Sequence, residues 1–574
     1  MDNPAIPGTG ASRRRFLGMI GGAALATTCS SDESPAPAST SAPDSTTSET
    51  AATSTSTEAP TTAAPVKTPG SDGITADPFT LGVASGDPWP TSVVLWTRLA
   101  PEPTTGNGGM PDQDYDVLYE LSLDDGFDAD VQAGRGLTTA DAAHHHSVHV
   151  EVGELAPATS YWYRFRVGDW VSPIGRTRTA PAANSRPDTV RVAVASCQAY
   201  MSGYYGAHRH LAAEELDAVL FVGDYIYERE AGSFEPRAIL LEGEPAPVPF
   251  NLEQYRHLYS VYKQDPDLQA AHAAHPWIIT WDDHEVEDNY ADNLPGGIGV
   301  TLGESTPENF PPRRAAAYQA WWENLPIRGP APTGGDIVIH RALDFGGLVR
   351  LAIVDDRQYR SPIAEGPGGG ALPRGFGGGP LLAESFDEDR TMLGFEQEQW
   401  LTEVLSASEA AWTVLVQQTV MAEVDRAPDD PDLGFSMDAW DGYVAARERL
   451  LATVREQVAD GGFISLGGDI HSGAVTDLYD TYRGDDRTLV GTEFVAPSIT
   501  SIELLQPGFL EGARANPHIH HYEPDRRGYL LVDFDAGEAR AAFRYIDDAE
   551  NADTGIETAS SWQVNRGVPG VVET

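Results

Sequence analysis

The sequence is poor in cysteine, in lysine and in long apolar runs. Its 574 residues include two cysteines and two lysines, and 86 acidic against 38 basic side chains give a formal net charge of −48. A surface this acidic repels nucleic acid, and no basic stretch interleaved with aromatic residues occurs, so we expect no nucleic-acid binding. Cys29 lies near the N-terminus and Cys197 stands alone in the rest of the chain, which excludes a disulfide within the folded part.

The first 33 residues have the pattern of an export signal, so we expect them not to belong to the folded domains. Arg13 and Arg14 precede a short apolar run that ends at Cys29 and is too short for a stable transmembrane helix. The segment 1–33 resembles a twin-arginine signal peptide, which implies export of the folded chain through the twin-arginine machinery. Cys29 followed by SSDE resembles a bacterial lipidation site. We therefore expect a secreted or cell-surface protein, either anchored to the membrane by a lipid on Cys29 or released by cleavage nearby.

Composition divides the remaining chain into four segments. Residues 34–76 are rich in Ser, Thr, Ala and Pro without apolar periodicity, which is typical of a disordered linker. Residues 77–182 contain short alternating runs such as SYWYRFRV and predict an N-terminal antiparallel β-sandwich domain. Residues 188–548 combine buried-type strands with helix-like stretches and predict an α/β catalytic domain. Residues 549–574 are expected to form a loose C-terminal tail.

Several buried-type strands of the segment 188–548 end in groups that bind metals or anions. The side chains at these strand ends are Cys197, Asp224, Tyr227, Asp282, Asp283, His284, Glu285, Arg357, Gln417, Gln418, Asp469 and His471. A single Asp at a strand end is commonly a turn former or a helix cap. Turns do not explain five or six strands that all end this way, and ligands bind at the carboxyl ends of strands in open α/β sheets. The pattern therefore predicts one shared site.

These side chains fall into two chemical sets. Thiolate, phenolate and imidazole suit a strongly polarising transition metal, whereas carboxylate and amide oxygens suit a harder ion such as Ca2+ or Mg2+. Asp224 belongs to both sets and is a candidate bridge between two metals, an arrangement that activates a hydroxide and takes up charge on a transferring phosphoryl group. Arg357 is then a candidate clamp on phosphate oxygens, and His284 a candidate proton donor to the leaving alkoxide.

The same motifs resemble those of a known enzyme family. GDYIY, WDDHE and GGDIH, with ASC upstream and LGVASGDPWPTSVVLWTRL in the predicted sandwich, are similar to motifs of the alkaline phosphatase D (PhoD-like) family of the metallophosphoesterase superfamily. The resemblance covers residues 77–548. It implies a four-layer sandwich of the metallophosphoesterase type behind the β-sandwich domain. It also implies an exported phosphatase and phosphodiesterase that attacks small phosphorylated substrates with a metal-activated hydroxide.

The resemblance further implies the metals and their ligands, namely ferric iron (Fe3+) with one or two calcium ions (Ca2+). Carried over by motif, the iron ligands would be Cys197, Asp224, Tyr227 and His471, and the calcium ligands Asp224, Asp283 and Asp469. His284 matches the proton-donor position of the superfamily's Asn-His motif. Asp283 stands where the wider superfamily has Asn, and its extra negative charge favours a hard ion such as calcium. Asn289 is a further candidate ligand, and Arg357 matches no motif securely.

Two alternatives remain open at this point. The first is a phospholipase D-like or teichoic-acid phosphodiesterase, whose partner would be a phospholipid or a cell-wall polymer. The second is a calcium-binding surface module without catalysis. That module predicts carboxylates alone, and it leaves Cys197, Tyr227 and His471 without a role.

Overall fold

A computed structural model describes most of the chain from residue 68 onward. The described residues are 68–128, 132–228, 236–237, 248–296, 303, 305–364, 379–430, 432–458, 462–502 and 507–574. The predicted signal peptide 1–33, Cys29 and most of the predicted linker 34–76 lie outside them. Among the described residues, no helix combines the length and apolarity that crossing a membrane requires.

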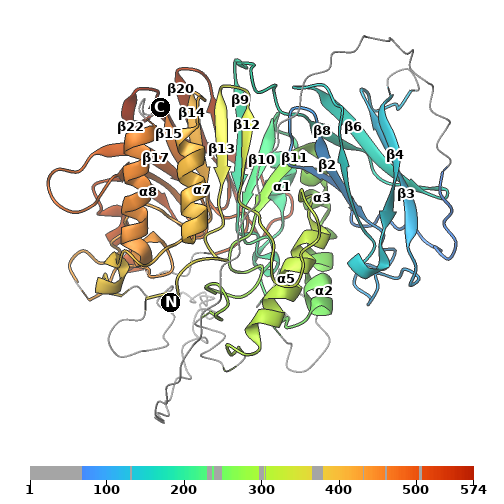
Figure 1. Cartoon of the computed structure of the whole chain (residues 1–574), viewed down its shortest axis with the longest axis horizontal. Coiled ribbons are helices and arrows are strands. Elements are labelled where there is room, and N and C mark those ends of the chain that lie inside the picture. The colour runs from blue at the N-terminus through green and yellow to red at the C-terminus, as the bar shows by residue number, and fades with distance from the viewer. Residues whose placement is uncertain are drawn as a thin grey trace, which may run out of the picture. The chain divides into compact units, whose positions relative to one another are not determined.

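A mixed sheet of ten strands forms the centre of the fold (Figure 1). In spatial order its strands are β22 (Val568–Glu573), β21 (Ile556–Asn565), β20 (Glu538–Ile546), β19 (Gly528–Phe534), β9 (Val190–Ala195), β10 (Ala218–Val222), β11 (Pro276–Thr280), β1 (Val83–Gly86), β2 (Val93–Arg98) and β5 (Ser147–Val152). The central strands β9, β10 and β11 pair in parallel. Runs such as AVLFV in β10 are apolar throughout because both faces of a central parallel strand are covered.

A second sheet of seven strands packs against the first. In spatial order its strands are β12 (Arg341–Phe345), β13 (Val349–Ile353), β14 (Trp412–Val416), β15 (Phe463–Gly467), β17 (Leu489–Val495), β16 (Gly473–Tyr479) and β18 (Ile519–Glu523). The strands β13, β14, β15 and β17 are parallel neighbours. One buried apolar cluster joins the two sheets, with Val192 and Leu220 from the first and Val414 and Ile464 from the second.

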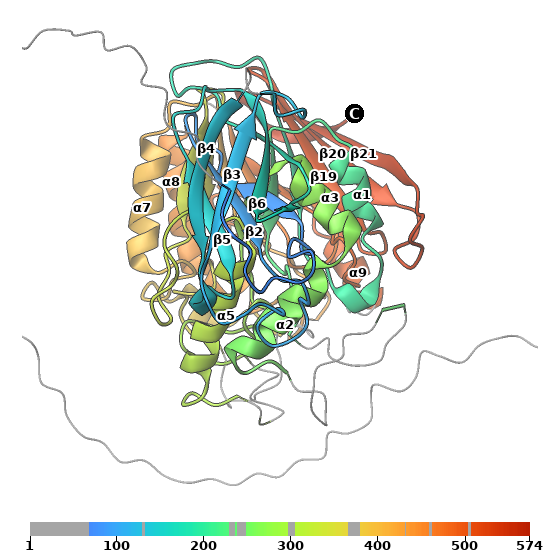
Figure 2. The same ribbon diagram turned by 90° about the vertical axis from the view of Figure 1, so that its right-hand side faces the viewer.

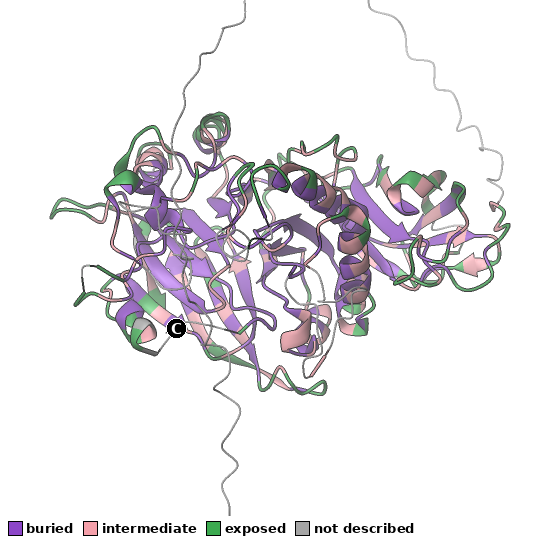
Figure 3. Cartoon of the chain, turned by 90° about the horizontal axis from the view of Figure 1, so that it is seen from below, coloured by how far each residue is buried: buried purple, intermediate pink, exposed green. Residues whose placement is uncertain are grey.

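Helices cover the outer faces of both sheets. The ten-stranded sheet shares an apolar cluster with α1 (Gly206–Ala212), α2 (Leu252–Lys263), α3 (Pro266–Ala274) and α5 (Phe310–Asn324). The seven-stranded sheet shares another with α7 (Phe395–Ser406), α8 (Val444–Gln457) and α9 (Pro507–Arg514). Short 3-10 turns are η2 (Ala142–His144), η3 (Tyr200–Ser202), η4 (Ala383–Phe386) and η5 (Trp440–Tyr443). The helix–sheet–sheet–helix order confirms the predicted four-layer sandwich, and Figure 3 shows its strands largely buried.

The N-terminal part is a β-sandwich, as predicted, but it is not a separate one. One layer is a five-stranded sheet of β4 (Gln132–Ala140), β3 (Tyr115–Ser122), β6 (Ser160–Val167), β7 (Trp170–Val171) and β8 (Gly175–Arg178), seen face-on in Figure 2. The other layer is the end of the ten-stranded sheet, since Leu95 and Val148 share one buried apolar cluster with Phe165. The segment 77–182 is continuous with the catalytic sheet because β1 pairs in parallel with β11.

The expectation of a loose tail at 549–574 is wrong. The strands β21 and β22 extend the ten-stranded sheet beyond β20. Trp562 and Val564 are buried and contribute to the core between the two sheets. Their neighbours are polar and partly exposed, and an antiparallel strand near a sheet edge needs only one apolar face. The alternation of buried and partly exposed residues in β21 is therefore that of a strand with one face on the core and one face toward solvent.

Candidate metal centre

Backbone hydrogen bonds hold the ends of two central strands of the ten-stranded sheet, β9 and β10, side by side. Cys197 follows β9, and its backbone N–H donates to the carbonyl of Gly223 at 3.1 Å. The backbone N–H of Gln198 donates to the carbonyl of Asp224, just beyond β10, at 3.1 Å. These bonds continue the parallel pairing past the strands, so Cys197 and Asp224 are delivered to the same edge.

The seven-stranded sheet delivers Asp469 and His471 to the same place. Asp469 directly follows the glycine pair of the GGDIH motif at the end of β15, and His471 lies two residues further along. A Cβ atom at Gly468 would lie 2.8 Å from Ser196 Oγ, at the end of β9. The absence of a side chain at Gly468 therefore permits the close approach of the two sheets that brings their strand ends together.

Seven of the strand-end side chains predicted to share one site make three overlapping clusters. Within each cluster the donor atoms all lie within 4.8 Å of one another. The clusters are Cys197–Asp224–His471, Asp224–Asp283–His284 and Asp282–Asp283–Asp469. Asp224 belongs to the first and second clusters, and Asp283 to the second and third. The site thus contains a thiol, imidazoles and carboxylates at one end and carboxylates alone at the other.

The backbone of the cluster residues is turned sharply after each strand. Four of them adopt left-handed conformations that non-glycine residues rarely use, with φ angles of 57° at Cys197, 60° at Asp224, 67° at Asp469 and 54° at His471. Each such residue costs about 1–3 kcal/mol and persists where the surrounding structure holds it in place. The fold therefore stores strain at this site, as is common where side chains must converge on a ligand.

Tyr227 joins the first cluster through its phenol oxygen. The hydroxyl donates to Asp224 Oδ2 at 2.7 Å and lies 2.9 Å from His471 Nε2. Ser501 Oγ donates to the same phenol oxygen at 2.7 Å and lies 2.8 Å from the carbonyl oxygen of Cys197. The phenol oxygen of Tyr227 therefore lies among the donor atoms of the first cluster, as its spacing of three residues from Asp224 predicted.

Burial perturbs the ionisation of these donors. It raises the pKa of the Cys197 thiol and of the Tyr227 phenol well above their usual values, and the carboxylate of Asp224 adds to both effects. It also raises the pKa of Asp469 to about 7 and lowers that of His471 to about 4. In every case the low-dielectric surroundings disfavour the charged form. A bound cation reverses the penalty for each anionic donor.

Two buried carboxylate oxygens that accept no hydrogen bond indicate whether metal ions fit this site. Asp224 Oδ1 and Asp282 Oδ2 are buried and have no hydrogen-bond donor. A buried carboxylate oxygen without a partner is unfavourable, and a cation satisfies it. The thiol, phenol and imidazole around Asp224 suit a transition metal, and the all-carboxylate cluster suits a hard ion such as calcium. The side chains present therefore fit the two predicted metals.

His284, a member of the second cluster, lies beside Tyr227 of the first and is held by Glu228, for which the sequence suggested no role. Its Nδ1 lies 2.7 Å from Glu228 Oε2, and its ring lies 4.3 Å from that of Tyr227, centroid to centroid. Burial alone would lower the pKa of His284, but the carboxylates of Glu228, Asp283 and Asp224 raise it well above its usual value. These carboxylates favour the protonated imidazole, and Glu228 engages its Nδ1. Glu228 directly follows GDYIY, so a local signal for it existed.

Arg357 is completely buried among carboxylates and does not face open space. Its Nε donates to Asp282, and one terminal nitrogen donates to Asp438 Oδ2 at 2.7 Å. Its other terminal nitrogen lies 3.8 Å from Asp283 and 3.7 Å from Asp469. The strand-end position was predicted correctly, but the hydrogen bonds go to Asp282 and Asp438, and the predicted ligands Asp283 and Asp469 lie just beyond hydrogen-bond distance. These contacts suit a residue that orients carboxylates better than a clamp on a substrate.

Asp438 is a residue of the site that the sequence did not reveal. It accepts hydrogen bonds from Arg357 and, at 2.7 Å, from Arg360. With its amide nitrogen turned toward Asp438, Asn289 also donates to this carboxylate, at 3.0 and 2.9 Å. The backbone N–H of Asn289 donates to Asp283 Oδ2 at 2.6 Å. Asn289, the further candidate ligand, therefore also orients Asp283. Asp438 lies in an irregular loop without a motif, so no local pattern identified it.

Glu285 organises the backbone below the clusters. Its buried carboxylate accepts hydrogen bonds from the backbone N–H groups of Asp224 at 3.1 Å, Tyr225 at 2.6 Å and Asp282 at 2.9 Å. Backbone donors on a carboxylate are charge-assisted bonds, which fix geometry strongly. Glu285 thus ties the ends of β10 and β11 together and sets the positions of two cluster carboxylates.

Two family models match the chain. The model described as PhoD-like phosphatase matches residues 192–543, and the model for the PhoD-like phosphatase N-terminal domain matches residues 63–181. Alkaline phosphatase D of Bacillus subtilis (strain 168) is 38% identical over 503 residues, which are 86% of this chain and 82% of that protein.

A solved structure agrees with the family models. A structure described as "Structure of PhoD" aligns with a TM-score of 0.78 and 36% identity, covering 88% of this chain and 93% of its own. Similarity of this extent in both sequence and fold confirms the resemblance that the motifs GDYIY, WDDHE and GGDIH indicated. The chain belongs to the PhoD-like phosphatase family and is a phosphoric ester hydrolase.

Proposed function

We propose that the chain is an exported phosphoesterase with an iron–calcium centre that hydrolyses phosphomonoesters and phosphodiesters. The observation that carries the proposal is the position of Asp224, which is shared between the cluster with Cys197 and His471 and the cluster with Asp283 and His284, while Asp283 in turn belongs to the all-carboxylate cluster with Asp282 and Asp469. A shared carboxylate is the ligand that a two-metal site requires, because it holds both ions at a fixed separation.

The ligands are those that the resemblance to the family implies, and the chemistry of their donor atoms suits the two ions. Cys197, Asp224, Tyr227 and His471 would hold Fe3+, and Asp224, Asp283 and Asp469 would hold Ca2+. Such a pair of ions, when bound, polarises a phosphoryl oxygen and lowers the pKa of a water molecule. The protein's part is to supply thiolate and phenolate, which requires that Cys197 and Tyr227 lose protons that their burial otherwise retains.

His284 is the proton donor to the leaving alkoxide in this mechanism. The carboxylate of Glu228 favours the protonated imidazole by raising its pKa, and it engages Nδ1. Nε2, which lies 3.9 Å from Asp288 Oδ1, is then the nitrogen that can give up a proton. Glu228 acts through His284 as a positioning residue.

Arg357 has a supporting role in this proposal. Its guanidinium contacts Asp282 and Asp438 and approaches Asp283 and Asp469, so it balances part of the negative charge of the calcium ligands and fixes their orientation. A positive charge at this depth favours the ionised form of the neighbouring carboxylates, whose burial otherwise disfavours it.

The substrate class proposed is small phosphorylated molecules, with diesters included. A phospholipase D-like or teichoic-acid phosphodiesterase activity remains the alternative, in which a phospholipid or a cell-wall polymer is the partner. A calcium-binding module without catalysis is not supported, because the chain belongs to a phosphatase family and its site includes Cys197, Tyr227 and His471.

Export completes the proposal. Arg13 and Arg14 ahead of a short apolar run support the twin-arginine route, and Cys29 supports a lipid anchor. Both features lie outside the described residues, so they are inferred from sequence alone. Mass spectrometry of the protein recovered from the producing cells tests them, because a diacylglycerol on Cys29 adds a large, defined mass.

Parallel assays test the proposed activity. The metal-loaded protein is expected to release nitrophenol from nitrophenyl phosphate and from bis(nitrophenyl) phosphate, and Asp224→Asn is expected to abolish both reactions while the circular dichroism spectrum is unchanged. Turnover of the monoester alone would remove the diesterase part of the proposal. Full activity in Asp224→Asn would remove the two-metal mechanism.

A further inference from the structure

The segment 496–502 crosses from the seven-stranded sheet to the ten-stranded sheet beside the first metal cluster. It follows β17 and forms a parallel bridge between Ser498 and Ser196, the residue that follows β9. The backbone N–H of Ile499 also donates to the carbonyl of Ser196, at 2.9 Å. The segment supplies none of the residues of the three metal clusters, so its place against them calls for another explanation.

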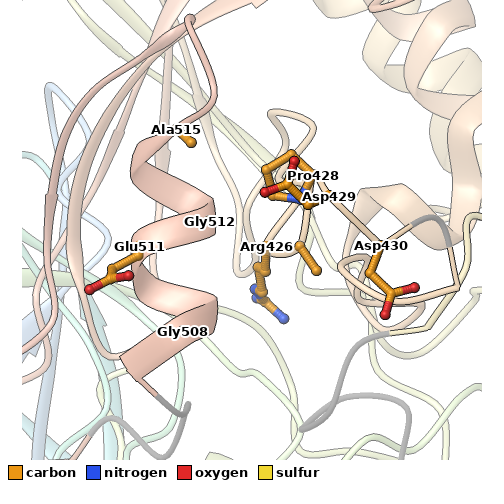
Figure 4. A pocket seen from close by; sticks show the side chains of 9 residues that line it. Arg426, Pro428, Asp429, Asp430, Gly508, Glu511, Gly512 and Ala515 are labelled. Atoms are coloured by element: carbon orange, nitrogen blue, oxygen red, sulfur yellow. The ribbon is translucent and has the colours of Figure 1, made fainter.

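The elements that the chain joins on either side of this segment are fixed parts of the fold. Upstream, Phe494 and Val495 of β17 are completely buried. Downstream, α9 packs against the loop 426–430 (Figure 4), and a Cβ atom at Gly512 would lie only 1.9 Å from the carbonyl oxygen of Arg426. The segment 496–502 therefore lies between two firmly packed elements.

The backbone of the segment holds two of the proposed iron ligands. The carbonyl oxygen of Cys197 accepts hydrogen bonds from the backbone N–H groups of Thr500 at 3.4 Å and Ser501 at 3.2 Å. The carbonyl oxygen of Ile502 lies 2.7 Å from His471 Nδ1. A carbonyl oxygen only accepts, so Nδ1 carries the hydrogen and the lone pair of Nε2 is left for a metal.

The side chain of Ser501 reaches a third proposed ligand, Tyr227. Ser501 is only 2% exposed, and its Oγ accepts a hydrogen bond from the backbone N–H of Ala199 at 3.1 Å. The same Oγ lies 2.7 Å from the phenol oxygen of Tyr227 and 2.8 Å from the carbonyl oxygen of Cys197. A hydroxyl has one hydrogen to donate, and the carbonyl of Cys197 already has two backbone donors. An anionic phenolate is the stronger acceptor, so the hydrogen goes to Tyr227 once its phenol is deprotonated.

We propose that Ser501 is a positioning residue for Tyr227, whose phenolate it holds through a donated hydrogen bond and whose donor strength toward iron it sets. The inference rests on the proposed iron centre and adds to it a residue that is not a ligand. A donated hydrogen bond draws charge from the phenolate oxygen and lowers the energy of its filled orbitals. More energy is then needed to move an electron from the phenolate to a ferric ion, so the hydrogen bond tunes the metal from outside its ligand set.

The visible spectrum of the full chain loaded with ferric iron tests the proposal. In Ser501→Ala the charge-transfer band should move to longer wavelength, because a phenolate without its donor releases an electron more easily. The affinity for ferric iron, measured by competition with a chelator, should fall about 10- to 100-fold, the value of a hydrogen bond to a charged group. Resonance Raman spectra excited in the band contain the ring and C–O vibrations of a phenolate, so they assign the shift to Tyr227 and not to the thiolate of Cys197.

Thr500→Val is the matched control within the same segment. The hydroxyl of Thr500 is completely buried and donates to the backbone carbonyl of Ala199 at 2.7 Å instead of to the side chain of a ligand. Valine keeps the shape of the side chain and removes this hydroxyl. Thr500→Val should therefore lower the free energy of unfolding and leave the band at its wild-type position.

Two outcomes would overturn the role of Ser501 and leave the iron centre intact. The first is a Ser501→Ala variant that binds iron and keeps the band at the wild-type wavelength. The second is an equal shift in Thr500→Val, since that would assign the effect to general loosening of the segment. A wild type that takes up no ferric iron would instead contradict the iron centre itself, and the role of Ser501 with it.

Discussion

The pair formed by His284 and Glu228 gives a quantitative prediction. In Glu228→Gln, the buried carboxylate that lies 2.7 Å from His284 Nδ1 becomes a neutral amide of the same shape. A hydrogen bond to a charged partner contributes about 1.5–3 kcal/mol, so we expect kcat for an alkyl phosphate to fall about 10- to 100-fold. The metal content should not change, because Glu228 is not among the proposed metal ligands.

The pH profile and the leaving group distinguish this role from a merely structural one. The protonated form of His284 is the active one, so the rate falls as pH rises through the pKa of that residue. Neighbouring carboxylates raise this pKa, and removal of the Glu228 charge lowers it, so the alkaline limb should move down by about one to two pH units. Nitrophenyl phosphate should be affected much less than an alkyl phosphate, because an acidic phenol leaves without a proton.

A control variant exists for this experiment. Glu493 is a completely buried glutamate that accepts hydrogen bonds from the backbone of Met421 and Ala422 and is not among the residues of the site described above. Glu493→Gln should lower stability without moving the pH profile. Equal losses on alkyl and nitrophenyl substrates in Glu228→Gln, or an unchanged alkaline limb, would refute the assignment of His284 as the proton donor.

Further predictions concern the iron ligands and the backbone of the site. Tyr227→Phe should reduce bound iron and weaken the visible absorption that a phenolate gives to ferric iron; an unchanged spectrum would exclude Tyr227 as a ligand. Gly223→Ala should destabilise the fold by about 1–3 kcal/mol or more in urea unfolding, because φ is +111° and the new Cβ would lie 2.4 Å from Asp282 Cβ. Gly484→Ala, at φ +77° with no atom within 4 Å of the new Cβ, is the control for backbone strain alone and should cost less.

The sequence predicted those parts of the site that depend on local patterns. Cys197, Asp224 and Asp469 each directly follow or nearly follow a continuous apolar run, and parallel strands that end at one edge must place such residues together. Glu228 directly follows the GDYIY motif and Glu285 is the last residue of WDDHE, but their roles depend on the folding of each strand end against the next. Nothing in the motifs indicates that their carboxylates would accept hydrogen bonds from His284 and from backbone N–H groups.

Features that depend on contacts between residues far apart in the sequence could not be predicted from local sequence patterns. Asp438 lies 81 residues from Arg357, in a loop, and only the tertiary fold brings them together. The β-sandwich was predicted from its alternating runs, but its continuity with the catalytic sheet depends on the pairing of β1 with β11, far along the chain. The C-terminal strands were missed because β21 has only two buried residues, Trp562 and Val564, and its polar face resembles a tail.

The central claim is that Asp224 holds two different metal ions at once. Metal analysis of purified wild type, Asp224→Asn and Asp283→Asn by inductively coupled plasma mass spectrometry tests it most directly. We expect iron and calcium in the wild type, loss of both in Asp224→Asn, and loss of calcium with retained iron in Asp283→Asn. A wild type that contains neither metal, or an Asp224→Asn variant that retains the full amount of either one, would contradict the account.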